Sequence, residues 1–181
     1  ALKAGCPIET SGVTVSRRPS SGLNAIATAA GRIIVDGAPI VVGAGVESIT
    51  HSMTGKGFTL QVDKPLAEEY PGLWMPMIET ADIVADRYNV SREAQDEYSL
   101  ESQRRTAAAQ EADLFKDEIV PMDTVMIVKD KETGETSEKA YTVTRDECNR
   151  PSTTLEGLSG LKPIRGEEHY ITAGNASQLS D

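Results

Sequence analysis

The stretch of sequence that decides the fold covers residues 13–25 and reads Val13-Thr14-Val15-Ser16-Arg17-Arg18-Pro19-Ser20-Ser21-Gly22-Leu23-Asn24-Ala25. It predicts an extended segment, a tight polar turn and the start of a helix that is rich in small residues. A nucleophile in such a turn would face the helix N-terminus, where the helix dipole and the free N–H groups lower the pKa of a thiol. An ordinary strand-to-helix turn explains these residues equally well.

The residues after the turn predict an α/β unit. Ser21 is a possible N-cap, and Gly37 is expected to end the helix. The apolar positions share one helical face: Leu23, Ile26, Ala27, Ala30, Ile33 and Ile34. A short apolar run at residues 40–46 then fits a strand that is buried on both faces. A strand, a helix and a second strand within about 35 residues are typical of a parallel crossover.

Two glycines in this second predicted strand invite a nucleotide-loop interpretation. Gly43 and Gly45 lack the third glycine of a dinucleotide-binding loop, because residue 48 is serine. We therefore interpret them as positions where the strand packs closely against another element.

The composition limits the classes of partner. The 181 residues carry a formal net charge of -10, which repels phosphate backbones and anionic lipid, so no nucleic acid and no membrane partner is expected. No apolar run approaches the ~20 residues of a bilayer span. No secretory signal is visible in the sequence, which favours a cytoplasmic location, with an organelle matrix left open. No metal site is expected, because the only histidines and cysteines, His51, His169, Cys6 and Cys148, lack ligand spacing.

The charge is divided unevenly along the chain. Residues 1–60 carry five basic and three acidic side chains, whereas residues 61–181 carry 13 basic and 25 acidic side chains. Aromatic residues, which usually dominate core burial, make up only 4% of the chain. The sequence therefore indicates two unlike pieces.

The second piece is predicted to be mixed α and β. Residues 50–75 are expected to form a loop, because glycine and proline recur there. Ser91 is the expected N-cap of the longest helix, which should end near residues 114–115. The remaining expected elements are a helix at 78–88, a hairpin of residues 118–129 and 140–145, a helix at 155–161 capped by Thr153 or Thr154, and a strand at 170–173.

Ordered motifs along the whole chain resemble those of the thiolase family. The stretch at 13–25 resembles the family's nucleophile region, and residues 43–49 resemble a core strand with its G-G-x-E-S-M turn. The other matching segments are residues 80–85, 91–96 and 102–103, then 115–121, 150–156, 161–163 and 172–177.

The resemblance implies a layered αβαβα fold and a division of this chain. Residues 1–49 would form part of the N-terminal core, residues 50–168 an acidic α+β loop domain that covers coenzyme A, and residues 169–181 a truncated return to the core. It further implies a homodimer or homotetramer that assembles through the core. The division would also explain the uneven charge, with the junction near residue 50.

Thiolases transfer acyl groups through a cysteine, by thiolysis of 3-ketoacyl-CoA or by Claisen condensation of acetyl-CoA in fatty acid metabolism. Coenzyme A or acyl-CoA is their substrate, and no covalently bound cofactor is implied. The family's cysteine position is Pro19 here. Proline has neither a thiol nor the backbone N–H that helps to form an oxyanion hole. The family's later asparagine, histidine and cysteine motifs do not occur in these residues, so this chain alone is predicted to be inactive.

The resemblance also implies three contacts with acyl-CoA. Arg150 matches an arginine beside the nucleotide, Ser177 a serine along the pantetheine, and Met77 a methionine near the acyl end. A solvated loop arginine remains the alternative for Arg150. Pro76, Gly157 and Arg165 replace residues that often frame this site.

Two hypotheses follow for the function. The chain is either the central piece of an acetyl-CoA acyltransferase, or a non-catalytic thiolase relative that binds acyl-CoA or serves in assembly. The cysteine or proline at position 19 distinguishes these two hypotheses.

Overall fold

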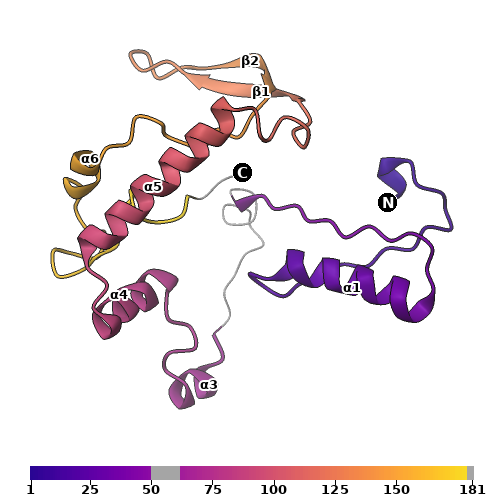
Figure 1. Cartoon of the computed structure of the whole chain (residues 1–181), viewed down its shortest axis with the longest axis horizontal. Coiled ribbons are helices and arrows are strands. Elements are labelled where there is room, and N and C mark those ends of the chain that lie inside the picture. The colour runs from indigo at the N-terminus through magenta and orange to yellow at the C-terminus, as the bar shows by residue number, and fades with distance from the viewer. Residues whose placement is uncertain (50–61, 179–181) are drawn as a thin grey trace. The chain divides into compact units, whose positions relative to one another are not determined.

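The computed structural model describes residues 1–49 and 62–178, which fall into two compact units (Figure 1). Residues 1–49 belong to the first unit and residues 62–178 to the second. His51 and most of the loop expected at 50–75 lie outside the described residues. In the part of the chain that the structure describes, no helix is long and apolar enough to cross a membrane.

The first unit contains a short 3-10 helix, η1 (Leu2–Ala4), and one long helix, α1 (Ser21–Asp36). Gly37 ends α1 with a φ of 68°, a left-handed conformation that glycine adopts easily, as the sequence predicts. The N-cap is Ser20 rather than Ser21. The Ser21 hydroxyl instead accepts a hydrogen bond from the Arg17 N–H at 2.9 Å. The helix therefore begins one residue earlier than expected.

The two strands expected in the first unit are extended segments without a ladder. Residues 13–15 and 40–46 have no strand assignment. A strand needs a neighbouring strand to pair with, and none is found among residues 1–49. Gly43 does lie close to α1, since a Cβ added there would be 3.1 Å from the Ile26 Cα, which agrees with the close packing expected of this glycine.

The second unit contains most of the secondary structure. Its elements are α3 (Lys64–Glu69), α4 (Met77–Tyr88), α5 (Arg92–Glu111), β1 (Met122–Lys129), β2 (Thr136–Val143) and α6 (Leu155–Ser159). The predicted Ser91 cap is confirmed, because its side chain accepts the Ala94 N–H, and Thr154 rather than Thr153 caps α6. α5 ends earlier than expected, before a left-handed Asp113 with a φ of 54°.

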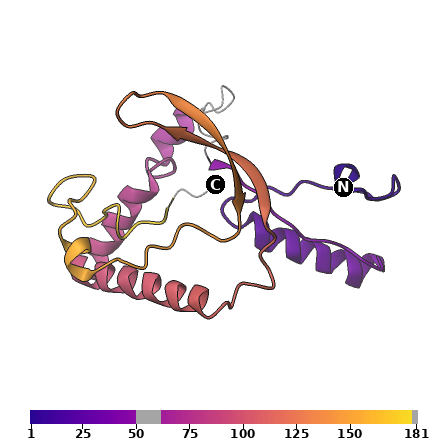
Figure 2. The ribbon, with the colours of Figure 1, turned by 90° about the horizontal axis from the view of Figure 1, so that it is seen from above.

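The hairpin is confirmed as an antiparallel pair in which Val125 lies opposite Ala140 (Figure 2). Residues 118–121 lie before its first strand and do not extend it. One helix was not expected: α3 begins after Asp63, whose side chain accepts the Leu66 N–H at 3.0 Å. Asp63 followed by Pro65 in the first turn is a recognisable helix start.

The described interior of the second unit is largely polar. Ala85 and Leu158 are the buried apolar residues, and Asp82, Asp96 and Thr172 are buried with them. α6 packs against α5. The strand expected at 170–173 is irregular chain instead, held by hydrogen bonds to side chains rather than by a neighbouring strand.

Candidate functional site

A cavity of about 640 Å³ lies in the second unit. Its walls come from α5, the loop at 148–154, α6 and the segment at 173–178. Arg150 and Ser177, two of the three residues predicted to contact acyl-CoA, both line it. Met77 does not line it: this methionine begins α4 and is 81% exposed.

The buried carboxylate of Asp96 joins the walls of the cavity. Its two oxygens both accept from Arg92 Nε, Oδ1 at 2.9 Å and Oδ2 at 2.8 Å. Oδ1 also accepts from the Asn175 side-chain amide at 3.1 Å. Arg92 Nη2 also donates to the carbonyls of Leu158 and Leu161, at 2.7 and 3.2 Å. One arginine on α5 therefore fixes α6, and its carboxylate partner fixes the segment that carries Ser177.

A second buried carboxylate, Asp82 on α4, holds the chain that approaches this wall. It accepts the Tyr170 N–H at 3.0 Å and Arg165 Nη1 at 3.1 Å. Burial opposes its ionisation most strongly, yet these hydrogen bonds and the nearby positive charge outweigh burial and lower the pKa of Asp82. Arg165 is thus tied to the Asp82 carboxylate.

The segment 172–175 turns tightly against α6. Thr172 Oγ1 accepts the N–H groups of Gly174 and Asn175, at 3.1 and 3.3 Å, and Asn175 Oδ1 accepts the Thr172 N–H at 2.8 Å. A Cβ at Gly174 would lie 2.5 Å from Leu158 Cδ2. This glycine therefore lets the wall that carries Ser177 approach α6 closely.

The loop that carries Arg150 is attached to α5 by Gln103. Gln103 Oε1 accepts the Asn149 amide and the Arg150 N–H, both at 2.8 Å. On the other side, the Arg150 carbonyl accepts the Thr153 hydroxyl at 2.7 Å. Residues 102–103 belong to the segments that resemble the family, but sequence reasoning gave Gln103 no role, because a glutamine on a helix has no characteristic spacing that marks a contact with a distant loop.

The loop with Arg150 and the segment with Ser177 are joined directly. Gln178, which follows Ser177, donates its Nε2–H to the carbonyl of Cys148, two positions before Arg150, at 2.7 Å. Among the described residues that line the cavity, Arg150 is the only one with a charged side chain. The cavity thus offers one exposed guanidinium beside several hydroxyl and amide groups.

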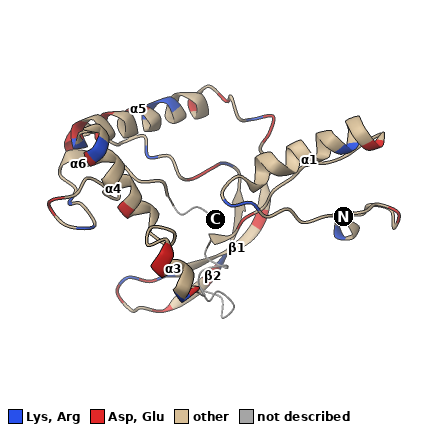
Figure 3. Cartoon of the chain, turned by 90° about the horizontal axis from the view of Figure 1, so that it is seen from below, with Lys and Arg blue, Asp and Glu red and all other residues tan. Residues whose placement is uncertain are grey.

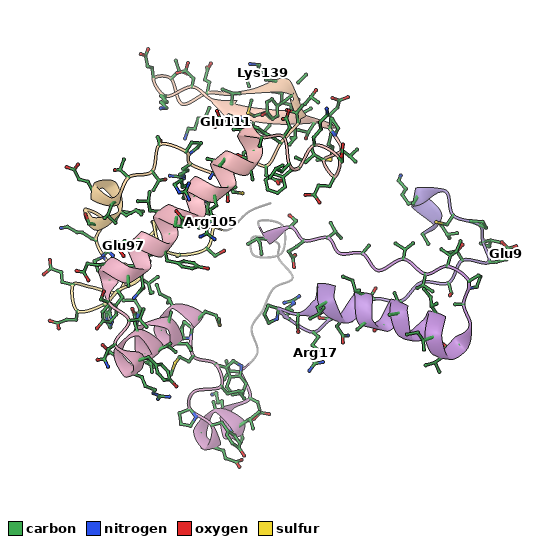
Figure 4. The ribbon with its side chains drawn as sticks, in the orientation of Figure 1. Glu9, Arg17, Glu97, Arg105, Glu111 and Lys139 are labelled. Carbon is green, nitrogen blue, oxygen red and sulfur yellow. The ribbon has the colours of Figure 1, made fainter. Side chains whose placement is uncertain are left out.

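Other arginines near this wall are already paired. Arg104 and Arg105 both bind the Glu101 carboxylate, each at 2.7 Å. The hydrogen bonds from Arg104 and then Arg105 lower the pKa of Glu101 to about 2. Basic and acidic residues both occur along α5 (Figure 3). Figure 4 labels Glu97, Arg105 and Glu111 along this helix.

The proline at the predicted nucleophile position belongs to the first unit. Pro19 is exposed and lies in the polar turn, where the Ser20 hydroxyl donates to the Arg17 carbonyl at 3.1 Å. A hollow of about 630 Å³ lies between α1 and the two extended segments, and Pro19 does not line it. Within the described residues, no group of three or more histidine, cysteine, aspartate or glutamate side chains could hold a metal ion.

Comparisons with known proteins agree on one family. The family model "Thiolase, N-terminal domain" matches residues 1–181. The chain is 42% identical to peroxisomal 3-ketoacyl-CoA thiolase 1 of Arabidopsis thaliana over 181 residues, which are all of this chain and 40% of that protein. It is 39% identical to beta-ketoadipyl-CoA thiolase of Pseudomonas aeruginosa over 196 residues, covering 99% of this chain and 46% of that protein.

Solved structures give the same result. Dimeric peroxisomal thiolase of Saccharomyces cerevisiae superimposes with a TM-score of 0.78 at 32% identity, covering 98% of this chain and 43% of that one. Human mitochondrial 3-ketoacyl-CoA thiolase in complex with CoA superimposes with a TM-score of 0.73 at 32% identity, covering 96% and 43%. The chain thus spans less than half the length of these relatives. The predicted thiolase-like α/β fold is confirmed, and the chain belongs to the thiolase family.

Proposed function

We propose that these residues form the coenzyme A-binding part of a protein with thiolase-type acyl transfer. The observation that carries this proposal is the cavity that Arg150 and Ser177 share although they are 27 positions apart. The Gln178–Cys148 hydrogen bond joins the two segments that carry them. The family resemblance implies both residues independently of this geometry.

The chemistry of the cavity suits the two ends of coenzyme A. The nucleotide end is anionic and aromatic, and an arginine can both bind phosphate and stack on adenine. The pantetheine arm is long and neutral, and hydroxyl and amide groups such as Ser177 can hydrogen-bond to its amides. The human relative is named as a complex with CoA, which supports this assignment. The role of Met77 at the acyl end stays a prediction, because Met77 lies outside this cavity.

The reaction proposed for the whole protein needs a nucleophile that these residues do not supply. In thiolysis, a cysteine thiolate attacks the 3-keto carbonyl of the 3-ketoacyl-CoA and a tetrahedral oxyanion forms. The bond between C2 and C3 then breaks, the departing acetyl-CoA carbanion takes up a proton, and the acyl group on the cysteine passes to the thiol of a second coenzyme A. Pro19 has no sulfur with which to attack and no N–H to donate to the oxyanion. We therefore propose that this chain alone is inactive. The proline also favours the second candidate function, a non-catalytic subunit that binds acyl-CoA or serves in assembly.

Domain limits, assembly and compartment are also proposals. We place the core fragment at 1–49, the coenzyme A-covering domain at 50–168 and the return to the core at 169–181, of which residues 50–61 and 179–181 are outside the described part. The yeast relative is described as dimeric, which supports a homodimer. Relatives named peroxisomal and mitochondrial stand beside bacterial ones, so a cytoplasmic location and an organelle matrix both fit.

Coenzyme A binding by the whole protein tests the proposed site. Arg150→Ala should weaken binding about tenfold in calorimetry, because hydrogen bonds to charged groups contribute about 1.5–3 kcal/mol. Arg145→Ala is the matched control, because it removes the same charge from the same stretch of chain but lines a different cavity. An unchanged affinity in Arg150→Ala would refute the assigned contact.

A thiolysis assay with a 3-ketoacyl-CoA separates the two candidate functions. A protein that carries Pro19, binds coenzyme A and forms no acyl-CoA product would be a binding or assembly subunit. Thiolysis by that same protein would contradict the proposed inactivity, and its nucleophile would then have to be sought elsewhere in the protein.

A further inference from the structure

Gln103 is the residue through which α5 reaches the loop of Arg150. Its side-chain oxygen accepts two hydrogen bonds, from Asn149 Nδ2 and from the Arg150 N–H, each 2.8 Å long. Its backbone carbonyl accepts Asn149 Nδ2 again, at 2.9 Å. The Asn149 amide is therefore held between the two carbonyl groups of one residue that is 46 positions earlier in the chain.

The loop has little regular structure of its own that could replace these bonds. Residues 148–154 belong to no helix or strand. The turn from Arg150 to Thr153 closes only the downstream side of Arg150. Upstream, Gln178 Nε2 donates to the Cys148 carbonyl at 2.7 Å, and this bond comes from the opposite wall.

We infer that Gln103 is a positioning residue, which fixes the backbone at Arg150 so that the guanidinium faces the nucleotide end of coenzyme A. This inference rests on the proposed binding of coenzyme A. The Arg150 guanidinium forms no ion pair with any described residue, so the hydrogen bonds at its backbone are what restrict where this side chain starts. Holding that backbone in advance lowers the ordering cost of binding.

The chain offers a matched control on the same helix. Gln110 also lies on α5 and also makes a hydrogen bond to the chain beyond the hairpin, donating to the Asp146 carbonyl at 3.0 Å. Gln110 lines a different cavity, and its side chain donates to Asp146 and not to Asn149 or Arg150. Gln103→Leu and Gln110→Leu therefore make the same side-chain change on the same helix, and each removes side-chain hydrogen bonds to the chain beyond the hairpin. Only the first variant releases Arg150.

Calorimetry on the whole protein tests the inference with two ligands, coenzyme A and pantetheine. Gln103→Leu should weaken coenzyme A binding about tenfold, because two hydrogen bonds are lost, and should leave pantetheine binding unchanged, because pantetheine has no nucleotide. Gln110→Leu should leave both affinities unchanged. In an Arg150→Ala background, the effect of Gln103→Leu should disappear, since a residue that acts through Arg150 has nothing left to position.

Each other outcome overturns a specific statement. If wild type does not bind coenzyme A, the proposed function fails, and this inference fails with it. If wild type binds and Gln103→Leu binds equally well, only the inference fails. An additive loss in the Arg150→Ala background, or an equal loss for pantetheine, would show a general structural role instead of positioning. Hydrogen exchange at the Arg150 amide, faster in Gln103→Leu than in Gln110→Leu, reports independently that the loop has been released.

Discussion

The second unit buries two paired carboxylates, whereas no described residue of the first unit is buried. Asp82 and Asp96 are 3% and 1% exposed and are fully engaged with partners in residues 62–178. On α1, by contrast, Leu23 and Ile34 are 73% and 80% exposed, and α1 buries none of its residues.

The difference teaches where each unit finds its stabilising contacts. The second unit builds its interior from hydrogen bonds between residues of its own stretch, so its cavity is supported from within. The first unit presents an amphipathic helix and two extended segments whose apolar faces need cover from outside residues 1–49. We therefore expect the loss of an ion-paired side chain to lower the free energy of unfolding strongly in the second unit and only slightly in the first.

The largest effect is expected from Asp96→Ala. The change leaves the Arg92 guanidinium, which is 18% exposed, without its carboxylate, and breaking one partner from a buried pair costs about 3 kcal/mol. Asp36→Ala is the matched change on α1, where Arg32 and Asp36 are 65% and 46% exposed. An exposed pair at this spacing contributes only about 0.5 kcal/mol. Urea unfolding of the whole protein gives both free energies, and equal losses would break the comparison.

Sequence reasoning succeeded where a structure depends on neighbours in the chain. The caps at Ser91 and Gly37 and the hairpin were predicted because each rests on residues a few positions apart. The prediction of a strand at 40–46 was wrong: these residues are extended, but they have no strand assignment. A strand also needs a neighbouring strand with which to form a hydrogen-bonded ladder. α3 was missed although Asp63 and Pro65 carry its start signal.

The candidate site shows the same limit. Arg150, Ser177 and Met77 came from the family resemblance, and only the first two share a cavity. The residues that build that cavity were not predictable from spacing, because Asp96 meets Asn175 across 79 positions and Asp82 meets Tyr170 across 88. The residues next to a helical aspartate in the sequence do not indicate that a loop far along the chain will bury its carboxylate.

A smaller loss of stability is expected from Gly43→Ala in the first unit. A Cβ at Gly43 would lie 3.1 Å from the Ile26 Cα, and the contact atom is backbone, so the segment or the helix must shift. Overpacking of this kind costs about 1 kcal/mol. Gly45→Ala is the control, because no atom lies within 4 Å of the added Cβ. A loss of stability in Gly43→Ala alone would show that close packing already matters within this apolar, exposed unit. Equal stability of the two variants would contradict it.

The mildest effect is the pH dependence that the Asp82 carboxylate confers on stability, because burial raises its pKa and hydrogen bonding lowers it. The net result is a pKa below the ordinary value of 3.8. A carboxyl group whose folded pKa is lowered stabilises the fold above its unfolded pKa, and this contribution is lost as the pH falls through the folded pKa. The groups that face Asp82 are the Tyr170 N–H, Arg165 and His169, whose Nδ1 lies 3.4 Å away.

Hydrogen exchange at the Tyr170 amide reports on this carboxylate directly, since that N–H donates to Asp82 Oδ1 at 3.0 Å. Above about pH 4, the amide should exchange more slowly in wild type than in Asp82→Asn, and the difference should shrink as the pH falls below 3.8. Asp86→Asn is the control on the same helix, because Asp86 binds the Tyr170 hydroxyl and not its amide. A constant difference across this range would mean that Asp82 holds the wall by hydrogen bonding that does not depend on its charge. In that case the two units would differ in packing alone and not in their response to acid.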